Sequence, residues 1–234
     1  MNNRNTRHGY CRIGLTLGAL LLTASCGSDN AQDYFPLGGD QVWDYEIRRS
    51  IKGEQHKQRL ILTSLPAANI EGAEYFPQLR IDDRVDVFSR TPDGITRVNF
   101  DKAGPPLSVL PAQLKPKATW QAPGQILFLE ITGAFHATFQ ERKKLTIDLD
   151  YTIEAMDDTV TVSAGRYSNC MRVKSSGSMF AGATLKEFLG IDFIQIEQTE
   201  WYAPGVGLVK RVRTESTTPA DWNNQFEQEL VALE

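Results

Sequence analysis

Alternation of apolar and polar side chains is the dominant pattern of the chain. Trp43, Tyr45 and Ile47 alternate with charged residues, and the same two-residue period runs through 145–154. Successive side chains of a strand point to opposite faces of a sheet, so this period predicts strands with one buried and one solvated face. Shorter alternating runs surround Leu60 and Val85 and predict further strands of the same kind.

Turn-forming residues separate these runs. We expect turns at Pro92-Asp93-Gly94, Asp157-Asp158, Ala164-Gly165 and 203–207, because proline, aspartate and glycine favour turn conformations. Consecutive strands joined by short turns pair antiparallel. The weak alternation of Phe226–Leu233 predicts a closing strand.

Two segments interrupt the strand pattern. The segment 103–116 carries four prolines and is expected to be an extended crossover, or the division between two domains. Met179–Leu189 has apolar residues at helical spacing and predicts the one short helix. The fold class predicted is therefore mainly β: a single curved antiparallel sheet of about ten strands, a half-barrel or open barrel, with one short helix.

The N-terminus has the layout of a signal peptide. Basic residues up to Arg12 precede an uncharged run, Ile13–Ala24, and small residues lead to Cys26. Twelve residues are too few to cross a hydrocarbon core that needs about 20 helical residues, which disfavours a permanent transmembrane helix. We therefore interpret 1–25 as a signal peptide.

Leu22-Thr23-Ala24-Ser25-Cys26 resembles the lipobox of bacterial lipoproteins, although leucine lies one position earlier than is typical. The resemblance implies that Cys26 carries the lipid anchor, and an ordinary secretory signal is the alternative. Residues 26–33 would then be the lipidated cysteine and a flexible tether, and 34–234 the β domain. By the same resemblance, Gly27 implies an outer-membrane lipoprotein facing the periplasm, with the inner membrane or the cell surface as alternatives.

Two further stretches carry a resemblance. Residues 34–45 and 200–210 look like the ends of uncharacterised bacterial lipoproteins, a family without a known activity. The expected topology is also similar to the half-barrel of lipoprotein-localisation factors, which implies a concave face able to hold acyl chains. A similarity of topology transfers no function by itself.

Charge disfavours one class of partner. Residues 26–234 contain 22 basic and 29 acidic side chains, a net charge of −7. Nucleic-acid binding needs a clustered positive field, which this composition does not indicate. We expect no nucleic-acid partner, and a membrane contact through the lipid anchor together with a protein of the envelope.

No motif of catalysis or cofactor binding is evident, so no cofactor and no enzyme activity are predicted. His56 and His136 lack companions at metal-ligand spacing, and the acidic groups at 82–86 and 148–150 lack a calcium loop, so no metal is predicted. Cys170 has no basic neighbour that would stabilise a thiolate and is expected to be a small buried hydrophobe rather than a nucleophile.

Three tryptophans are the candidate ligand-binding residues. Trp43, Trp120 and Trp201 could line a groove, although aromatic residues on strand faces are more often part of a core. The function that these observations favour is a lipid-anchored, non-catalytic accessory or scaffold of the envelope. A carrier of a hydrophobic ligand in the concave face of the sheet is the alternative, followed by an enzyme whose site is assembled from scattered residues.

Overall fold

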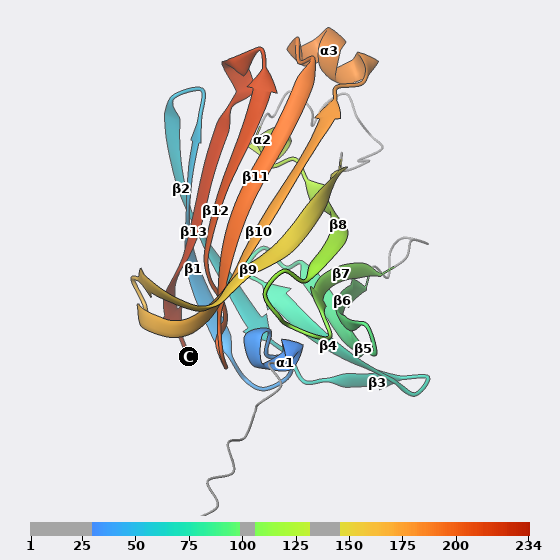
Figure 1. Ribbon diagram of the computed structural model, residues 1–234. Coiled ribbons are helices and arrows are strands. Elements are labelled where there is room, and N and C mark those ends of the chain that lie inside the picture. Colours follow the sequence, from blue (N-terminus) through green and yellow to red (C-terminus); the bar gives the residue numbers. More distant parts are fainter. Residues whose placement is uncertain (1–29, 99–105, 132–145) are drawn as a thin grey trace, which may run out of the picture.

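The computed structural model describes residues 30–98, 106–131 and 146–234, and a single antiparallel sheet accounts for most of them (Figure 1). Thirteen strands form the sheet, somewhat more than the ten expected. They are β1 (Val42–Ile51), β2 (Glu54–Ser64), β3 (Ala68–Ile70), β4 (Ala73–Arg80), β5 (Val85–Thr91), β6 (Gly94–Val98), β7 (Leu107–Pro111), β8 (Thr119–Gln125), β9 (Thr146–Val162), β10 (Gly165–Phe180), β11 (Phe193–Ala203), β12 (Gly207–Thr218) and β13 (Asn224–Leu233).

The strand order explains the shape. Along the sheet the strands lie in the order β7-β6-β5-β4-β2-β1-β13-β12-β11-β10-β9-β8, and β3 pairs with β4. The C-terminal strand β13 therefore lies between β1 and β12 and joins the two halves of the chain. A twisted sheet of this size curls on itself, and here it forms one strongly curved, barrel-like layer, which confirms the predicted fold class (Figure 1).

Several predicted turns are confirmed. The β5–β6 hairpin turns at Pro92-Asp93, the β9–β10 hairpin at Ser163-Ala164, and the β11–β12 hairpin at Pro204–Val206. Gly94 has a φ of +131°, and a Cβ there would lie 2.1 Å from the carbonyl oxygen of Leu110. Glycine is therefore required at this position by both its backbone conformation and the close approach of β7.

One predicted interruption of the sheet is wrong, and a second is wrong in part. Asp157-Asp158 forms no turn, because β9 runs without a break from Thr146 to Val162. Within the proline-rich segment, Leu107–Pro111 forms the strand β7, which pairs with β6, whereas residues 112–116 lie outside the strands in the connection from β7 to β8, at the other end of the strand order. β7 has a neighbour on one side only, and proline is tolerated on such an edge because an outward-facing edge position needs no N–H donor. No domain boundary follows from these prolines.

The helices are short. The expected helix at 179–189 begins later than predicted, because β10 continues to Phe180 and α3 spans Ala183–Leu189. Single turns are formed by α1 (Ala31–Tyr34) and α2 (Phe128–Ile131), and a 3₁₀ turn, η2, by Ala220–Trp222. The end of the expected tether belongs to the fold, since Ala31 is buried and Asn30 pairs with Gln113.

Three apolar clusters make the core. One joins β4–β7 to β9–β11 and includes Phe76, Phe88 and Met171. A second gathers β1, β13 and the tip of the β9–β10 hairpin around Trp43 and Leu230. The third lies under α3 around Leu185 and Ile194. Burial of these side chains is the main stabilising contribution to the sheet.

In the described part of the chain, no helix has the length and apolar character needed to cross a lipid bilayer.

Candidate functional site

The predicted lipidation site lies outside the described residues. The first described residue is Asn30, four residues after Cys26. Four extended residues span at most about 14 Å, so a lipid on Cys26 would hold α1 close to the membrane. α1 lies at the lower end of the molecule in Figure 1, and α3 lies at the opposite end.

The three candidate tryptophans do not converge on one groove. Trp43 and Trp201 pack in the cluster around Leu230, whereas Trp120 packs in the cluster around Phe76. The indole N–H of Trp43 donates to the carbonyl oxygen of Val206 at 2.6 Å. These positions give the tryptophans a role in the core, the alternative that strand alternation favours.

Trp201 and Trp120 also contact other side chains. The indole N–H of Trp201 donates to Oδ2 of Asp158 at 3.0 Å. Trp120 stacks on Tyr151 with ring centroids 5.1 Å apart, and its buried indole N–H has no hydrogen-bond acceptor among the described residues.

The other residues singled out from the sequence are dispersed. His56 is exposed beside Glu54, and His136 lies outside the described residues. Asp82 pairs with Arg80 and Arg84, and Asp150 accepts a hydrogen bond from Gln121. Within residues 30–98, 106–131 and 146–234, no group of three potential metal ligands occurs.

Cys170 is fully buried, as expected. Its thiol donates weakly to the carbonyl oxygen of Tyr167 at 3.6 Å, and burial raises the pKa of the thiol. A thiol that is shielded and held protonated is a poor nucleophile. Cys170 therefore has the role of a small apolar residue.

The interior holds a charged group that strand alternation did not predict. Glu215, on β12, is completely buried and accepts hydrogen bonds from the backbone N–H groups of Leu127 and Phe128 at 2.8 and 2.9 Å. Arg213 donates to the same carboxylate at 2.6 Å, and Asn224 donates at 3.0 Å. Five donors from three segments thus saturate one carboxylate and tie α2 to the middle of the sheet.

A second ion pair lies further along the sheet, where Glu200 is buried and the side chain of Arg211 is 31% exposed. Arg211 contacts Glu200 at 2.6 and 2.7 Å and also donates to Gln228 at 3.5 Å. Burial alone would lower the pKa of Arg211, but Glu200 and the neighbouring tyrosines raise it. Burial, and after it the charge of Glu200, raise the pKa of Tyr151 to about 12. At neutral pH Arg211 is therefore charged and Tyr151 is neutral.

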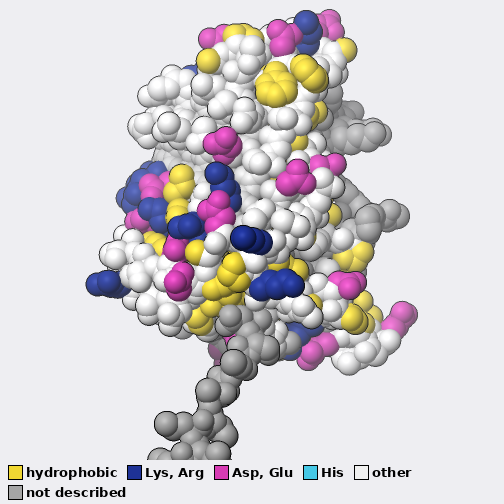
Figure 2. Space-filling model, in the orientation of Figure 1, with side chains coloured by type: hydrophobic (Ala, Val, Ile, Leu, Met, Phe, Trp, Pro, Cys, Tyr) yellow, Lys and Arg dark blue, Asp and Glu magenta, His cyan; other side chains and the backbone are white. Residues whose placement is uncertain are grey.

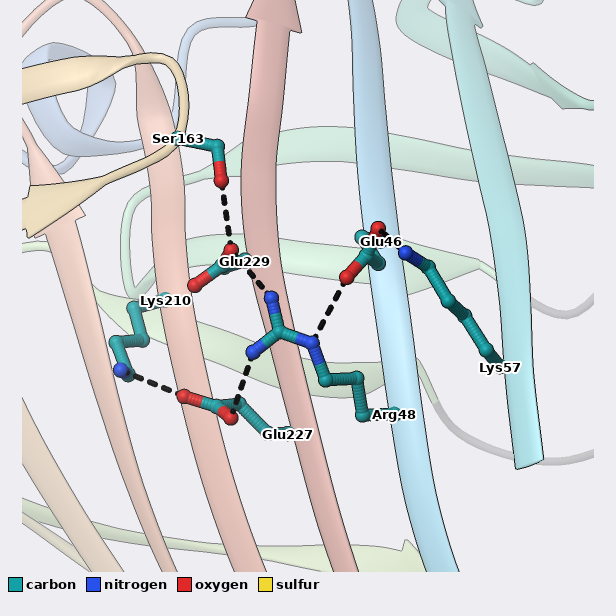
Figure 3. Close-up of polar contacts among 7 residues, drawn as sticks. All are labelled: Glu46, Arg48, Lys57, Ser163, Lys210, Glu227 and Glu229. Atoms are coloured by element: carbon teal, nitrogen blue, oxygen red, sulfur yellow. Dashed lines mark hydrogen bonds and ion pairs between the residues drawn. The ribbon is translucent and has the colours of Figure 1, made fainter. Parts of the chain in front are cut away.

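The outward face of β1, β2, β12 and β13 carries a dense group of charges (Figure 3). Arg48 lies at its centre, with its guanidinium 2.8 Å from Glu46, 3.2 Å from Glu227 and 2.7 Å from Glu229. We call this group the ion-pair cluster; its members are Glu46, Arg48, Lys57, Ser163, Lys210, Glu227 and Glu229. Its three acids and three bases compensate one another, so it offers little net charge to a ligand.

Ser163 connects the ion-pair cluster to the long hairpin. Its hydroxyl donates to Glu229 at 2.8 Å, and the next residue, Ala164, donates its backbone N–H to Leu230. These two contacts fix the tip of the β9–β10 hairpin on β13. The cluster is therefore best explained as a structural element that closes the lower part of the sheet.

Above the ion-pair cluster, the outward face is polar but almost uncharged. Residues paired directly across an antiparallel sheet share a face. One such row is Ser178–Gln195–Ser216, and the next is Ser176–Glu197–Thr214–Gln225–Ser50. We call these eight residues the neutral face. In Figure 2 the corresponding surface, over β10–β12, is largely free of apolar and charged side chains between the charged lower half and the α3 end.

Two hollows lined by described residues do not resemble a lipid-binding cavity. One, of about 660 Å³, is shallow and open and is lined by Lys52, Gly53 and 220–223. The other, of about 60 Å³, lies beside α1 and is too small for an acyl chain. A ligand site for a hydrophobic molecule is usually a concave apolar cavity of roughly 300 Å³ or more.

Comparisons with known proteins find solved structures with low similarity to this chain. No protein-family model matches it, and no curated protein matches its sequence. A protein from Bacteroides fragilis, assigned as exported and with a YmcC-like fold, is 10% identical, with a TM-score of 0.42 over 86% of this chain and 98% of the other. A protein from Parabacteroides distasonis, assigned as a lipoprotein, is 13% identical, with a TM-score of 0.39 over the same shares. A LolA superfamily protein from Nitrosomonas europaea is 10% identical, with a TM-score of 0.23 over 88% of this chain and 89% of the other. Likenesses of this size assign no function to the chain.

Proposed function

We propose that the chain is the precursor of a lipid-anchored protein of the bacterial envelope. In this proposal Cys26 carries the lipid, and residues 30–234 act as a non-catalytic accessory or scaffold at the outer membrane, facing the periplasm. The lipobox-like sequence ending at Cys26 supports the anchor, and its closeness to α1 would hold one end of the sheet at the membrane surface.

The non-catalytic part of the proposal rests on the buried carboxylates, which are already hydrogen-bonded or ion-paired with neighbouring residues. Glu215 is satisfied by five donors, and Glu200 is paired with Arg211. A catalytic acid, base or nucleophile needs a reactive protonation state and access to a substrate. Groups that are saturated by their neighbours contribute to the fold instead. The sheet is then a rigid body whose outward faces are available to partners.

The test compares the wild-type protein with Cys26→Ala by intact mass and by membrane fractionation. We expect the wild type to be membrane-bound with the mass of a diacylglycerol and an acyl chain, because several acyl chains make anchoring effectively permanent. Cys26→Ala should lack this mass. Cys11→Ala is the matched control, since Cys11 lies in the expected signal peptide and its loss should leave acylation unchanged.

Three outcomes decide between the proposals. If the wild type and Cys26→Ala are equally soluble and unacylated, the lipid-anchor proposal is wrong and an ordinary secretory signal replaces it. If purified wild type releases a stoichiometric amount of additional lipid on extraction, the carrier replaces the scaffold. If only the covalent lipid is recovered, the scaffold proposal stands.

A further inference from the structure

The neutral face has an unusual chemical character for the outside of this chain. Charged residues make up 23% of the sequence, yet Glu197 is the one charged member of the eight residues of the face, and Asp150 borders them beside Ser176. The neighbouring rows toward the β9–β10 hairpin contain the ion-pair cluster. We propose that the neutral face binds a neutral polysaccharide chain.

Hydrogen-bonding capacity is the first support for this ligand. The side chains of Ser176, Ser178, Thr214, Ser216 and Gln225 make no hydrogen bond to another described residue, and they lie on β10, β12 and β13. Hydroxyl and amide groups both donate and accept, and so do the hydroxyls of a sugar. A neutral glycan can therefore pair with these side chains without the desolvation cost of an ion.

The spacing of the groups suits a linear polymer. Neighbouring strands lie about 4.8 Å apart, so each row offers one polar side chain per strand at that interval. This interval is similar to the length of one pyranose ring. A glycan chain that crosses β10, β11 and β12 would meet a new donor or acceptor at each successive sugar.

An exposed aromatic pair borders the face. Phe180, at the end of β10, is 81% exposed and pairs across the sheet with Phe193. Their ring centroids lie 5.3 Å apart at 62°, so Phe193 supports Phe180 from the side and leaves a ring face open. The face of an aromatic ring is electronegative and attracts the C–H edge of a sugar ring. Phe180 would thus form the end of the binding surface.

Charge and composition disfavour other occupants. A polyanion such as a nucleic acid or an anionic membrane would need basic side chains, which the two rows lack. A stable protein interface usually has an apolar core surrounded by a polar rim. Here hydroxyls and amides occupy the centre and the apolar residues lie at the border, the reverse arrangement.

Binding is tested with wild-type protein purified in detergent, by co-sedimentation with insoluble chitin and cellulose and by titration with chitohexaose. We expect wild type to sediment with at least one of the two polymers. Ser216→Arg and Thr214→Arg place long side chains in the two rows and should weaken binding about tenfold or more through lost hydrogen bonds. Phe180→Ala should weaken it by a similar factor.

Matched controls separate binding from folding. Thr159→Arg changes an exposed strand threonine on the β9–β10 hairpin, and Ile70→Ala removes an exposed apolar side chain of the β3–β4 hairpin. Both should bind like wild type, and all variants should keep the wild-type melting temperature within a few degrees.

The site is independent of the lipid anchor, so failure of acylation at Cys26 would not affect this result. Absence of wild-type binding to chitin, cellulose and chitohexaose overturns the proposal, and so does equal binding by the Arg variants. Retention on heparin alone, or loss by these variants of a co-purifying protein without any glycan binding, assigns the face to another occupant.

Discussion

The carboxylate of Glu215 accepts the backbone N–H of Phe128 at 2.9 Å, across 87 residues of sequence. Both residues are completely buried. The first residues of a helix have N–H groups without an internal acceptor, and here the Glu215 carboxylate fulfils that role for the single turn of α2. One side chain on β12 therefore fixes where the segment after β8 meets the sheet.

Replacement of Glu215 is expected to be strongly destabilising. Glu215→Gln removes the charge that compensates Arg213, whose side chain is 5% exposed. An uncompensated buried charge costs about 3–5 kcal/mol, and we expect a loss of this size in the free energy of unfolding measured with urea. Glu197→Gln, an exposed position on the adjacent strand, should change that free energy by less than about 0.5 kcal/mol. Equal effects of the two variants would contradict the role of Glu215.

A second prediction concerns two glycines near the α3 end. A Cβ on Gly177, in β10, would lie 2.3 Å from the carbonyl oxygen of Asp148 and 2.8 Å from Leu149, so Gly177→Ala requires the β9–β10 pair to separate. Overpacking of this kind typically costs 1–3 kcal/mol, and we expect that loss in chemical unfolding. Gly182→Ala is the control, because nothing lies within 4 Å of its Cβ and its φ is −68°. A destabilised Gly182→Ala and an unaffected Gly177→Ala would reverse the expected order.

Alternation predicted the sheet well because an exposed and a buried face select different side chains at every second position. The turn expected at Asp157-Asp158, which rested on the preference of aspartate for turns, was wrong. In the structure β9 continues there, since the carboxylate of Asp158 accepts hydrogen bonds from Arg172 on β10 and from Trp201 on β11. Contacts from distant residues stabilise a strand that local preference disfavours.

Alternation also failed to predict that charged side chains lie in the interior. Arg211, Arg213 and Glu215 alternate with Val212 and Thr214, a pattern that normally indicates charges in solvent. In the structure Val212 is exposed and Glu215 is buried. On β11 the sequence did contain an indication of buried polar residues. Gln198 and Glu200 follow Ile194 and Ile196 at every second position, so their side chains lie on the same face as these isoleucines. The neutral face could not be predicted at all, because its rows depend on the register of five strands.

Acid should weaken the ion-pair cluster. The hydrogen bond from Lys210 lowers the pKa of Glu227 below its ordinary value of 4.5, and Lys57 has the same effect on Glu46. A carboxylate whose pKa is depressed in the folded state stabilises the fold above its unfolded pKa, and this stabilisation disappears as the pH falls through the folded value. We therefore expect the melting temperature at low salt to decrease below about pH 4.5.

Lys210→Met identifies the source of this acid sensitivity. Without Lys210, the pKa of Glu227 should rise toward its ordinary value, and the melting temperature should decrease less steeply between about pH 5 and 3. Lys174→Met removes a lysine outside the ion-pair cluster and should leave the slope unchanged. Parallel curves for wild type and Lys210→Met would exclude the cluster as a source of the pH dependence.

Cys170 tests whether the β9–β10 hairpin stays closed on β13. Burial shields the thiol and raises its pKa, so alkylation by iodoacetamide at neutral pH requires local opening of the hairpin. We expect Cys170 to react at least about a hundredfold more slowly than the exposed thiol introduced by Ser178→Cys, with peptide mapping by mass spectrometry as the readout.

Ser163→Ala removes the hydroxyl that donates to Glu229, and it should increase the rate of alkylation at Cys170 while leaving the rate at the reference thiol of Ser178→Cys unchanged. If Cys170 reacts in wild type as rapidly as the reference thiol, the hairpin is open in solution and its contacts with β13 contribute little to the fold. If Ser163→Ala leaves a slow rate unchanged, the backbone contact of Ala164 with Leu230 and the apolar packing keep the hairpin closed without the ion-pair cluster.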